Sequence, residues 1–144
     1  MEKSLSLLKQ IQEQFEVKAQ DVRTYSPLVL AYIGDAVYEQ IIRTILVSEG
    51  HQTVNGLHKK ACNFVKAEAQ AKMIQNLMEE LSEEEQAVYR RGKNAKPHTT
   101  SKNGTVADYH KATGFEALVG YLYLEDKMDR VLYLVKAGME TLKQ

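Results

Sequence analysis

Two apolar stretches decide the fold: LVLAYIGDAVY at residues 28–38 and GFEALVGYLYL at residues 114–124. Both are apolar nearly all round a helix, which predicts that they pack in the interior of the protein. Each stretch nevertheless contains one acid, Asp35 in the first and Glu116 in the second. Burying an ionised carboxylate costs on the order of several kcal/mol unless the group is neutralised, paired or bound to a cation. Since no Lys or Arg lies one helical turn from Asp35, we consider a divalent metal ion shared by the two acids.

Glycines stand beside both acids, with Gly34 directly before Asp35 and with Gly114 and Gly120 on either side of Glu116. A glycine inside a helix costs about 1 kcal/mol relative to alanine, so glycines placed in this way predict close backbone approach between two packed helices. Such an approach would bring the two carboxylates together, although they are far apart in the sequence.

The composition is that of one domain. The chain has 144 residues and is 44% hydrophobic, so we expect residues 1–144 to form a single domain with its own core. The 19 basic and 19 acidic residues cancel, so any binding of a polyanion depends on local charge. The lone Cys62 excludes an internal disulfide and suits a reducing compartment. With no signal-peptide pattern and no apolar run of membrane-spanning length, we expect a cytoplasmic protein without membrane contact.

The apolar periodicity is helical along the whole chain and no segment alternates with a period of two, which predicts an all-α fold. Polar capping residues mark the expected helix starts, at Ser26, Thr53, Ser82, Thr105 and Asp126. The expected helices, with their caps, span residues 5–15, 26–48, 53–78, 82–92, 105–124 and 126–142. The turn-rich residues 92–104 are expected to form a loop.

Two motifs resemble the ribonuclease III family: YIGDAVYE at residues 32–39 is similar to its signature helix, and ATGFEALVG at residues 112–120 is similar to its second acidic helix. In its length the chain looks most like the short bacterial branch of that family, which lacks a C-terminal double-stranded-RNA-binding domain. The resemblance covers nearly the whole chain after about residue 20. It implies a ribonuclease III-like helical endonuclease domain and a homodimeric, Mg²⁺-dependent endoribonuclease that cleaves double-stranded RNA. For the short branch it implies maturation of the 23S ribosomal RNA precursor, in which a ribosomal protein on the substrate is a further possible partner.

Only Asp35 and Glu116 match the metal-site carboxylates of the longer relatives. Where those relatives have further acids, this chain has Leu28, Ala31 and Thr113. The resemblance therefore assigns both catalysis and metal binding to Asp35 and Glu116, and we expect one well-held Mg²⁺ per subunit. Cleavage would be metal-assisted hydrolysis that leaves 5′-phosphate and 3′-hydroxyl ends. Glu39, one turn after Asp35, could support the metal site, but we expect it to be exposed.

No acid occurs from Gln86 to Ala107, so positive charge is concentrated around the loop that follows the fourth expected helix. We predict RNA binding by this segment, since phosphate contacts supply much of the affinity for nucleic acids. The candidate RNA-binding residues are Arg90, Arg91, Lys93, Asn94, Lys96 and Lys102. The alternative is an ordinary solvated loop.

Tyr32 stands where the family has an aromatic residue at its dimer contact, so the resemblance implies a symmetric dimer built from the Asp35 helices. The alternative for Tyr32 is packing in the core of its own subunit. For the whole protein, the main alternative is a non-catalytic RNA-binding or ribosome-associated protein that has kept the fold. A metal-dependent nucleotide hydrolase is a weaker alternative, because it would need a denser set of acids.

Overall fold

The computed structural model describes residues 4–50, 53–95 and 105–143, and every regular element in these ranges is an α-helix or a 3₁₀ turn. The all-α prediction is confirmed. The elements are α1 (Leu7–Gln14), η1 (Val22–Thr24), α2 (Pro27–Ser48), α3 (Val54–Val65), α4 (Ala67–Leu77), η2 (Met78–Glu80), α5 (Glu83–Asn94), α6 (Val106–Leu124) and α7 (Met128–Thr141). None of the helices in this described part of the chain combines the length and the apolar character that a membrane crossing requires.

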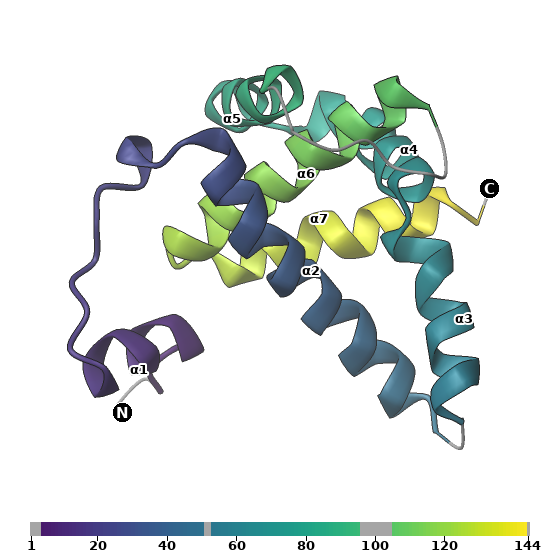
Figure 1. The fold of residues 1–144 in the computed structure, drawn as a ribbon, viewed down its shortest axis with the longest axis horizontal. Coiled ribbons are helices and arrows are strands. Elements are labelled where there is room, and N and C mark those ends of the chain that lie inside the picture. Colours follow the sequence, from purple (N-terminus) through teal and green to yellow (C-terminus); the bar gives the residue numbers. More distant parts are fainter. Residues whose placement is uncertain (1–3, 51–52, 96–104, 144) are drawn as a thin grey trace.

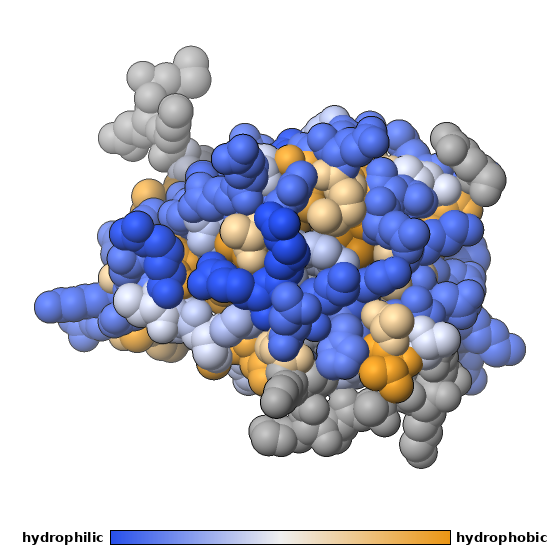
Figure 2. Space-filling model, turned by 90° about the horizontal axis from the view of Figure 1, so that it is seen from above, coloured by the Kyte–Doolittle hydropathy of each residue, from blue (hydrophilic) through white to orange (hydrophobic). Residues whose placement is uncertain are grey.

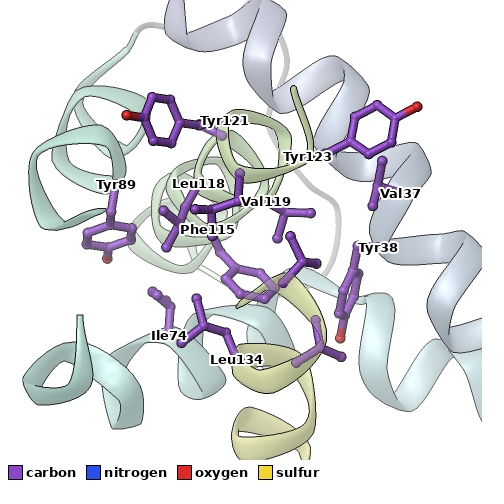
Figure 3. Packing of buried hydrophobic residues seen from close by; sticks show 14 of the residues in the cluster. Val37, Tyr38, Ile74, Tyr89, Phe115, Leu118, Val119, Tyr121, Tyr123 and Leu134 are labelled. Carbon is purple, nitrogen blue, oxygen red and sulfur yellow. The ribbon is translucent and has the colours of Figure 1, made fainter. Parts of the chain in front are cut away.

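Helix α6 forms the centre of the fold, and α2, α4, α5 and α7 pack around it (Figure 1). Every residue from Ala112 to Tyr123 is buried except Glu116, which is half-buried. Phe115 of α6 is fully buried and meets Tyr38 of α2 edge to face, with ring centroids 5.4 Å apart. Around Phe115, Figure 3 shows side chains from α4 and α7, including Ile74 and Leu134. The second apolar stretch is thus the core helix that its pattern predicts.

Most of the predicted helix starts are confirmed by hydrogen bonds. Ser26 accepts from the backbone N–H of Val29, and Pro27 occupies the first helical position of α2. Capping boxes start α5 at Ser82 and α6 at Thr105. These starts depend on local side-chain hydrogen bonds, so they can be recognised within a few residues of sequence.

The expected single helix over residues 53–78 is wrong, because the chain breaks at Lys66 into α3 and α4. Lys66 has an extended backbone, with φ −66° and ψ 151°. The carbonyl groups at the end of α3 find partners elsewhere: the Tyr38 hydroxyl donates to the Phe64 oxygen at 2.6 Å, and the Gln70 amide donates to the Val65 oxygen at 2.7 Å. The break lets α4 bury one face against α6 and α7, while α3 stays exposed or half-buried.

The predicted cap at Asp126 is also wrong, because α7 starts two residues later, at Met128. Asp126 instead ends α6 in a left-handed conformation, with φ 61°. Its N–H donates to the Tyr123 oxygen, and the N–H of Lys127 donates to the Leu122 oxygen. These two bonds form a Schellman motif, in which a short polar side chain such as Asp tolerates the left-handed position.

Candidate active site

Helices α2 and α6 cross in direct backbone contact, as the glycines predict. A Cβ on Gly34 would lie 1.7 Å from the Glu116 carbonyl oxygen, and a Cβ on Gly120 would lie 2.0 Å from the Leu30 carbonyl oxygen. Alanine therefore fits at neither position without separating the helices. Gly114 serves a different contact, because its Cβ would meet the Tyr89 carbonyl oxygen of α5 at 2.7 Å.

The two acids converge at this crossing. Asp35 directly follows Gly34, and Gly34 touches the backbone of Glu116, so both carboxyl groups line one cleft of about 490 Å³. An adjoining hollow of about 430 Å³, on the side of α3 and α4, has the same two acids in its wall. The packing of two glycines thus places side chains from distant parts of the sequence in a shared site.

The two acids differ in burial. Glu116 is half-buried, whereas Asp35 is exposed, which corrects the expectation that α2 is interior on every side. One face of α2 lies open in the single chain: Val29 is 47% exposed and Tyr32 is 81% exposed. Asp35 can therefore reach solvent or a ligand, while Glu116 forms the inner wall of the cleft.

The pKa of Glu116 is raised to about 8, mainly by burial and next by the charge of the neighbouring Asp35 and a hydrogen bond with it. A hydrogen bond from Gln70 opposes the shift, and the charge of Glu39 adds to it. Two carboxylates that share one site resist ionising together unless a cation neutralises them. In the absence of a cation, Glu116 is therefore mostly protonated at neutral pH.

The residues of the cleft fit a hard divalent cation. Carboxylate oxygens are the ligands that Mg²⁺ prefers, and Mg²⁺ commonly uses one or two carboxylates together with water and phosphate oxygens. Among the described residues no cluster of three or more His, Cys, Asp and Glu side chains could hold a metal, so the acid pair is the candidate site. Glu39 also lines the cleft, half-buried rather than exposed as expected, and forms an ion pair with Arg43 at 3.6 Å.

Sequence reasoning missed two residues of the site, Gln70 and Lys66. Gln70 is 2% exposed, and its Nε2 donates to Glu116 Oε2 at 3.3 Å. Lys66 is exposed and lines the adjoining hollow. Both depend on the break between α3 and α4, for which the local sequence carries neither a proline nor a glycine.

Helix α5 continues to Asn94, so Lys93 and Asn94 lie on the helix rather than in the expected loop. Arg90, Arg91 and Asn94 are exposed and Lys93 is half-buried. Lys96 and Lys102 lie outside the described residues. The face of the molecule that carries α5 is largely hydrophilic (Figure 2).

The end of α5 adjoins the cleft through Gly92. A Cβ on Gly92 would come within 3.0 Å of the Gly114 Cα and 3.3 Å of the Thr113 carbonyl oxygen. Thr113 lines the cleft with Asp35. The C-terminal end of α5 therefore packs beside the wall of the cleft at Thr113.

Tyr32 does not pack in the core of its own chain, so that alternative is wrong. Its side chain lines the outer part of the same cleft. The exposed ring lies on the open face of α2, close to the acids.

The fold is that of a ribonuclease III domain, and the ribonuclease III domain family matches residues 28–127. Mini-ribonuclease 3 of Clostridium tetani is 49% identical over 84% of this chain and 81% of its own length. Mini-ribonuclease 3 of a Thermoanaerobacter species is 46% identical over 85% of this chain and 87% of its own. A crystal structure of a protein from Fusobacterium nucleatum matches with a TM-score of 0.75 and 31% identity, over 85% of this chain and 98% of that one.

The chain belongs to the ribonuclease III family, on the branch of its Mini-ribonuclease 3 relatives. The prediction of an endoribonuclease is confirmed, and the non-catalytic alternative loses its support. Enzymes of this family act on double-stranded RNA and depend on a metal ion.

Proposed function

We propose that this protein is a Mg²⁺-dependent endoribonuclease in which Asp35 and Glu116 hold the metal ion and carry the catalysis. The observation that supports this proposal most directly is the convergence of the two acids in one cleft. The raised pKa of Glu116 supports it as well, because a divalent cation would relieve the repulsion between the two carboxylates.

The two acids of the cleft have different proposed roles, because they differ in exposure. Asp35, which is exposed, would hold the ion from the solvent side of the cleft, where the RNA backbone can reach it, and Glu116, which is half-buried, would hold it from the inner side. When bound, Mg²⁺ polarises the scissile phosphoryl group and lowers the pKa of a water molecule that attacks in line. The products carry 5′-phosphate and 3′-hydroxyl ends.

The basic end of α5 is the proposed RNA-binding surface, with Arg90, Arg91, Lys93 and Asn94. Lys96 and Lys102 belong to the proposed RNA-binding residues but lie outside the described part of the chain. Exposure of the two arginines and contact between Gly92 and the cleft wall support this role. Positive charge at a helix C-terminus also interacts favourably with the helix dipole, so these residues stabilise α5 in addition to any phosphate binding.

We further propose a homodimer with two-fold symmetry, in which the exposed Tyr32 contacts the partner subunit. Burying the open face of α2 would remove the exposed apolar side chains Val29 and Tyr32 from water. Two symmetry-related clefts would then cut the two strands of a duplex.

The proposed substrate is the 23S ribosomal RNA precursor in the cytoplasm, with a ribosomal protein assisting substrate presentation. This substrate is the one that the resemblance to the short branch of the family implies. The test is a gel assay of the purified protein on duplex RNA from that precursor, with Mg²⁺ or with EDTA.

We expect the wild type to cleave the RNA with Mg²⁺ and not with EDTA. Asp35→Asn should cleave it about 100-fold or more slowly, because an amide is a poor replacement for a charged metal ligand. The susceptibility of the products to a 5′-phosphate-dependent exonuclease checks the chemistry of the ends. Wild-type rates of Mg²⁺-dependent cleavage by Asp35→Asn would contradict the assignment.

A further inference from the structure

Gln70 links the inner acid of the cleft to the break between α3 and α4. Its Nε2 donates to two acceptors, the Val65 carbonyl oxygen at 2.7 Å and Glu116 Oε2 at 3.3 Å. One acceptor is the last carbonyl of α3 and the other is a carboxylate in the centre of α6. A single amide group therefore connects three helices at the wall of the site.

The orientation of this amide follows from its partners. The Val65 carbonyl oxygen can only accept a hydrogen bond, so the NH₂ group must face it, and the reversed amide would oppose oxygen to oxygen at this shorter contact. The cost falls on Gln70 Oε1, which is buried and finds no hydrogen-bond partner among the described residues. An unsatisfied buried oxygen destabilises the folded protein, so its retention requires a benefit elsewhere.

The benefit is that the hydrogen bond from Gln70 restricts the conformation of the Glu116 side chain. Glu116 projects from a helix that is otherwise buried around it, and a carboxylate on two flexible methylenes has several rotamers. The bond from Gln70 restrains Oε2 of a carboxyl group that lines the cleft together with Asp35. Side chains that orient metal ligands in this way change metal affinity by about 10- to 100-fold.

We propose that Gln70 is a positioning residue that holds the Glu116 carboxylate in the orientation in which it binds a divalent cation together with Asp35. This inference rests on the proposed function, because it assumes that Glu116 is a metal ligand. Gln70 does not touch the RNA, and its effect reaches the reaction through Glu116 alone.

A matched pair of substitutions separates this role from a structural one. Gln86 also donates from Nε2 to the carbonyl oxygen five residues before it, Leu81, and to the Met78 oxygen, but it lies away from the cleft. Gln70→Met and Gln86→Met both replace an amide by an isosteric side chain without donors. A purely structural role predicts that both variants lose thermal stability and that neither loses metal affinity.

The experiment measures Mn²⁺ binding to the RNA-free protein by electron paramagnetic resonance, in the wild type, Asp35→Asn, Gln70→Met and Gln86→Met. We expect Gln70→Met to bind Mn²⁺ about 10-fold or more weakly than the wild type, and Gln86→Met to bind it like the wild type. In the cleavage assay, a higher Mg²⁺ concentration should restore the kcat of Gln70→Met, with KM for RNA unchanged.

Equal Mn²⁺ affinity of Gln70→Met and the wild type would overturn the role of Gln70 and leave the proposed function intact. If the wild type binds no Mn²⁺ in a manner that depends on Asp35, the proposed function itself fails. Where Gln70→Met does not fold, Gln70→Ala replaces it, because the smaller side chain lets water reach the Val65 carbonyl. Failure of both variants to fold would mark Gln70 as structural and would also overturn the inference.

Discussion

Glu116 combines two roles in one residue: its backbone carbonyl packs against Gly34, and its carboxyl group faces a cleft that already contains Asp35. The helix packing fixes the position of the Glu116 backbone, and so places its carboxyl group in a buried position beside Asp35. Burial and the charge of Asp35 raise the pKa of this carboxyl group. An acid held in this way favours metal binding over the stability of the metal-free protein.

The metal-free protein should therefore become more stable when Glu116 is replaced by Gln. The pKa of Glu116 rises from 4.5 in the unfolded chain to about 8 in the folded protein. Between these values the folded protein binds the extra proton, so the free energy of unfolding falls as pH rises through this window. Glu116→Gln lacks this fall, and we expect it to be more stable than the wild type by about 1–3 kcal/mol at pH 9 and nearly equal at pH 5.

Urea denaturation in EDTA at the two pH values measures the difference. The same titration with excess Mg²⁺ serves as the control, because the ion should stabilise the wild type and not the variant. A stability gain of the same size at both pH values would contradict the assigned cause.

At the level of residues, the sequence predicts the acid pair, because a carboxylate in an apolar helix is anomalous in any fold. It does not predict Gln70, because a polar residue in a partly polar helix is ordinary until the tertiary fold buries it. The exposure of Asp35 cannot be predicted from the apolar pattern of α2 either. An apolar helix face that is open to solvent and one that is covered by another helix have the same kind of sequence.

At the level of helices, the crossing of α2 and α6 decides whether the site exists. Gly34→Ala should destabilise the protein by about 3 kcal/mol or more, because the new Cβ would overlap the Glu116 carbonyl oxygen. The variant should also lose metal affinity, since relief of the overlap moves the two acids apart.

Gly138→Ala is the matched control, because it is also a buried helical glycine but its Cβ would meet the flexible end of Met73 at 2.8 Å. Thermal unfolding and Mn²⁺ titration of both variants give the comparison. Similar small losses in the two variants would show that the crossing tolerates a side chain and that the site does not depend on it.

The helix starts could be predicted from the sequence, whereas the break at Lys66 could not. A capping box such as Ser82 with Glu85 is local, so it can be read from four residues. The end of α3 depends on the Tyr38 hydroxyl and the Gln70 amide, which reach its carbonyl groups only in the folded protein.

At the level of the whole molecule, the open face of α2 should be covered by a second copy of the chain. We expect the wild type to sediment as a dimer and Tyr32→Glu as a monomer, because the substitution removes the exposed ring and places a charge in the interface. Val47→Glu is the control, since Val47 is 64% exposed at the other end of the same helix. A monomeric wild type, or a dimeric Tyr32→Glu variant, would refute the proposed interface.

RNA binding should depend on the basic end of α5. Replacing Arg90, Arg91 and Lys93 by Gln should weaken binding and flatten its salt dependence, by about one unit of slope for each phosphate that the protein no longer neutralises. Replacing Lys59 and Lys60, which are exposed on α3, is the control for net charge. Filter binding at several salt concentrations measures both slopes, and equal slopes would assign phosphate binding to another surface.

The helical class and the identity of the two acids follow from the sequence and from the family resemblance, but the arrangement of the site does not. The apolar residues of α2 and α6 predict that both helices are buried, and their glycines predict that each helix packs closely against another helix. Which glycine meets which helix, as Gly34 meets α6 and Gly114 meets α5, is a property of the complete packing.

Whether Asp35 and Glu116 together bind the metal ion can be seen by anomalous X-ray diffraction from crystals soaked in Mn²⁺, which stands in for Mg²⁺. We expect one strong peak per subunit within about 2–2.5 Å of a carboxylate oxygen of both Asp35 and Glu116, or joined to one of them through a single water. A peak bound by other residues, or a fully occupied site that leaves these two acids without the ion, would contradict it.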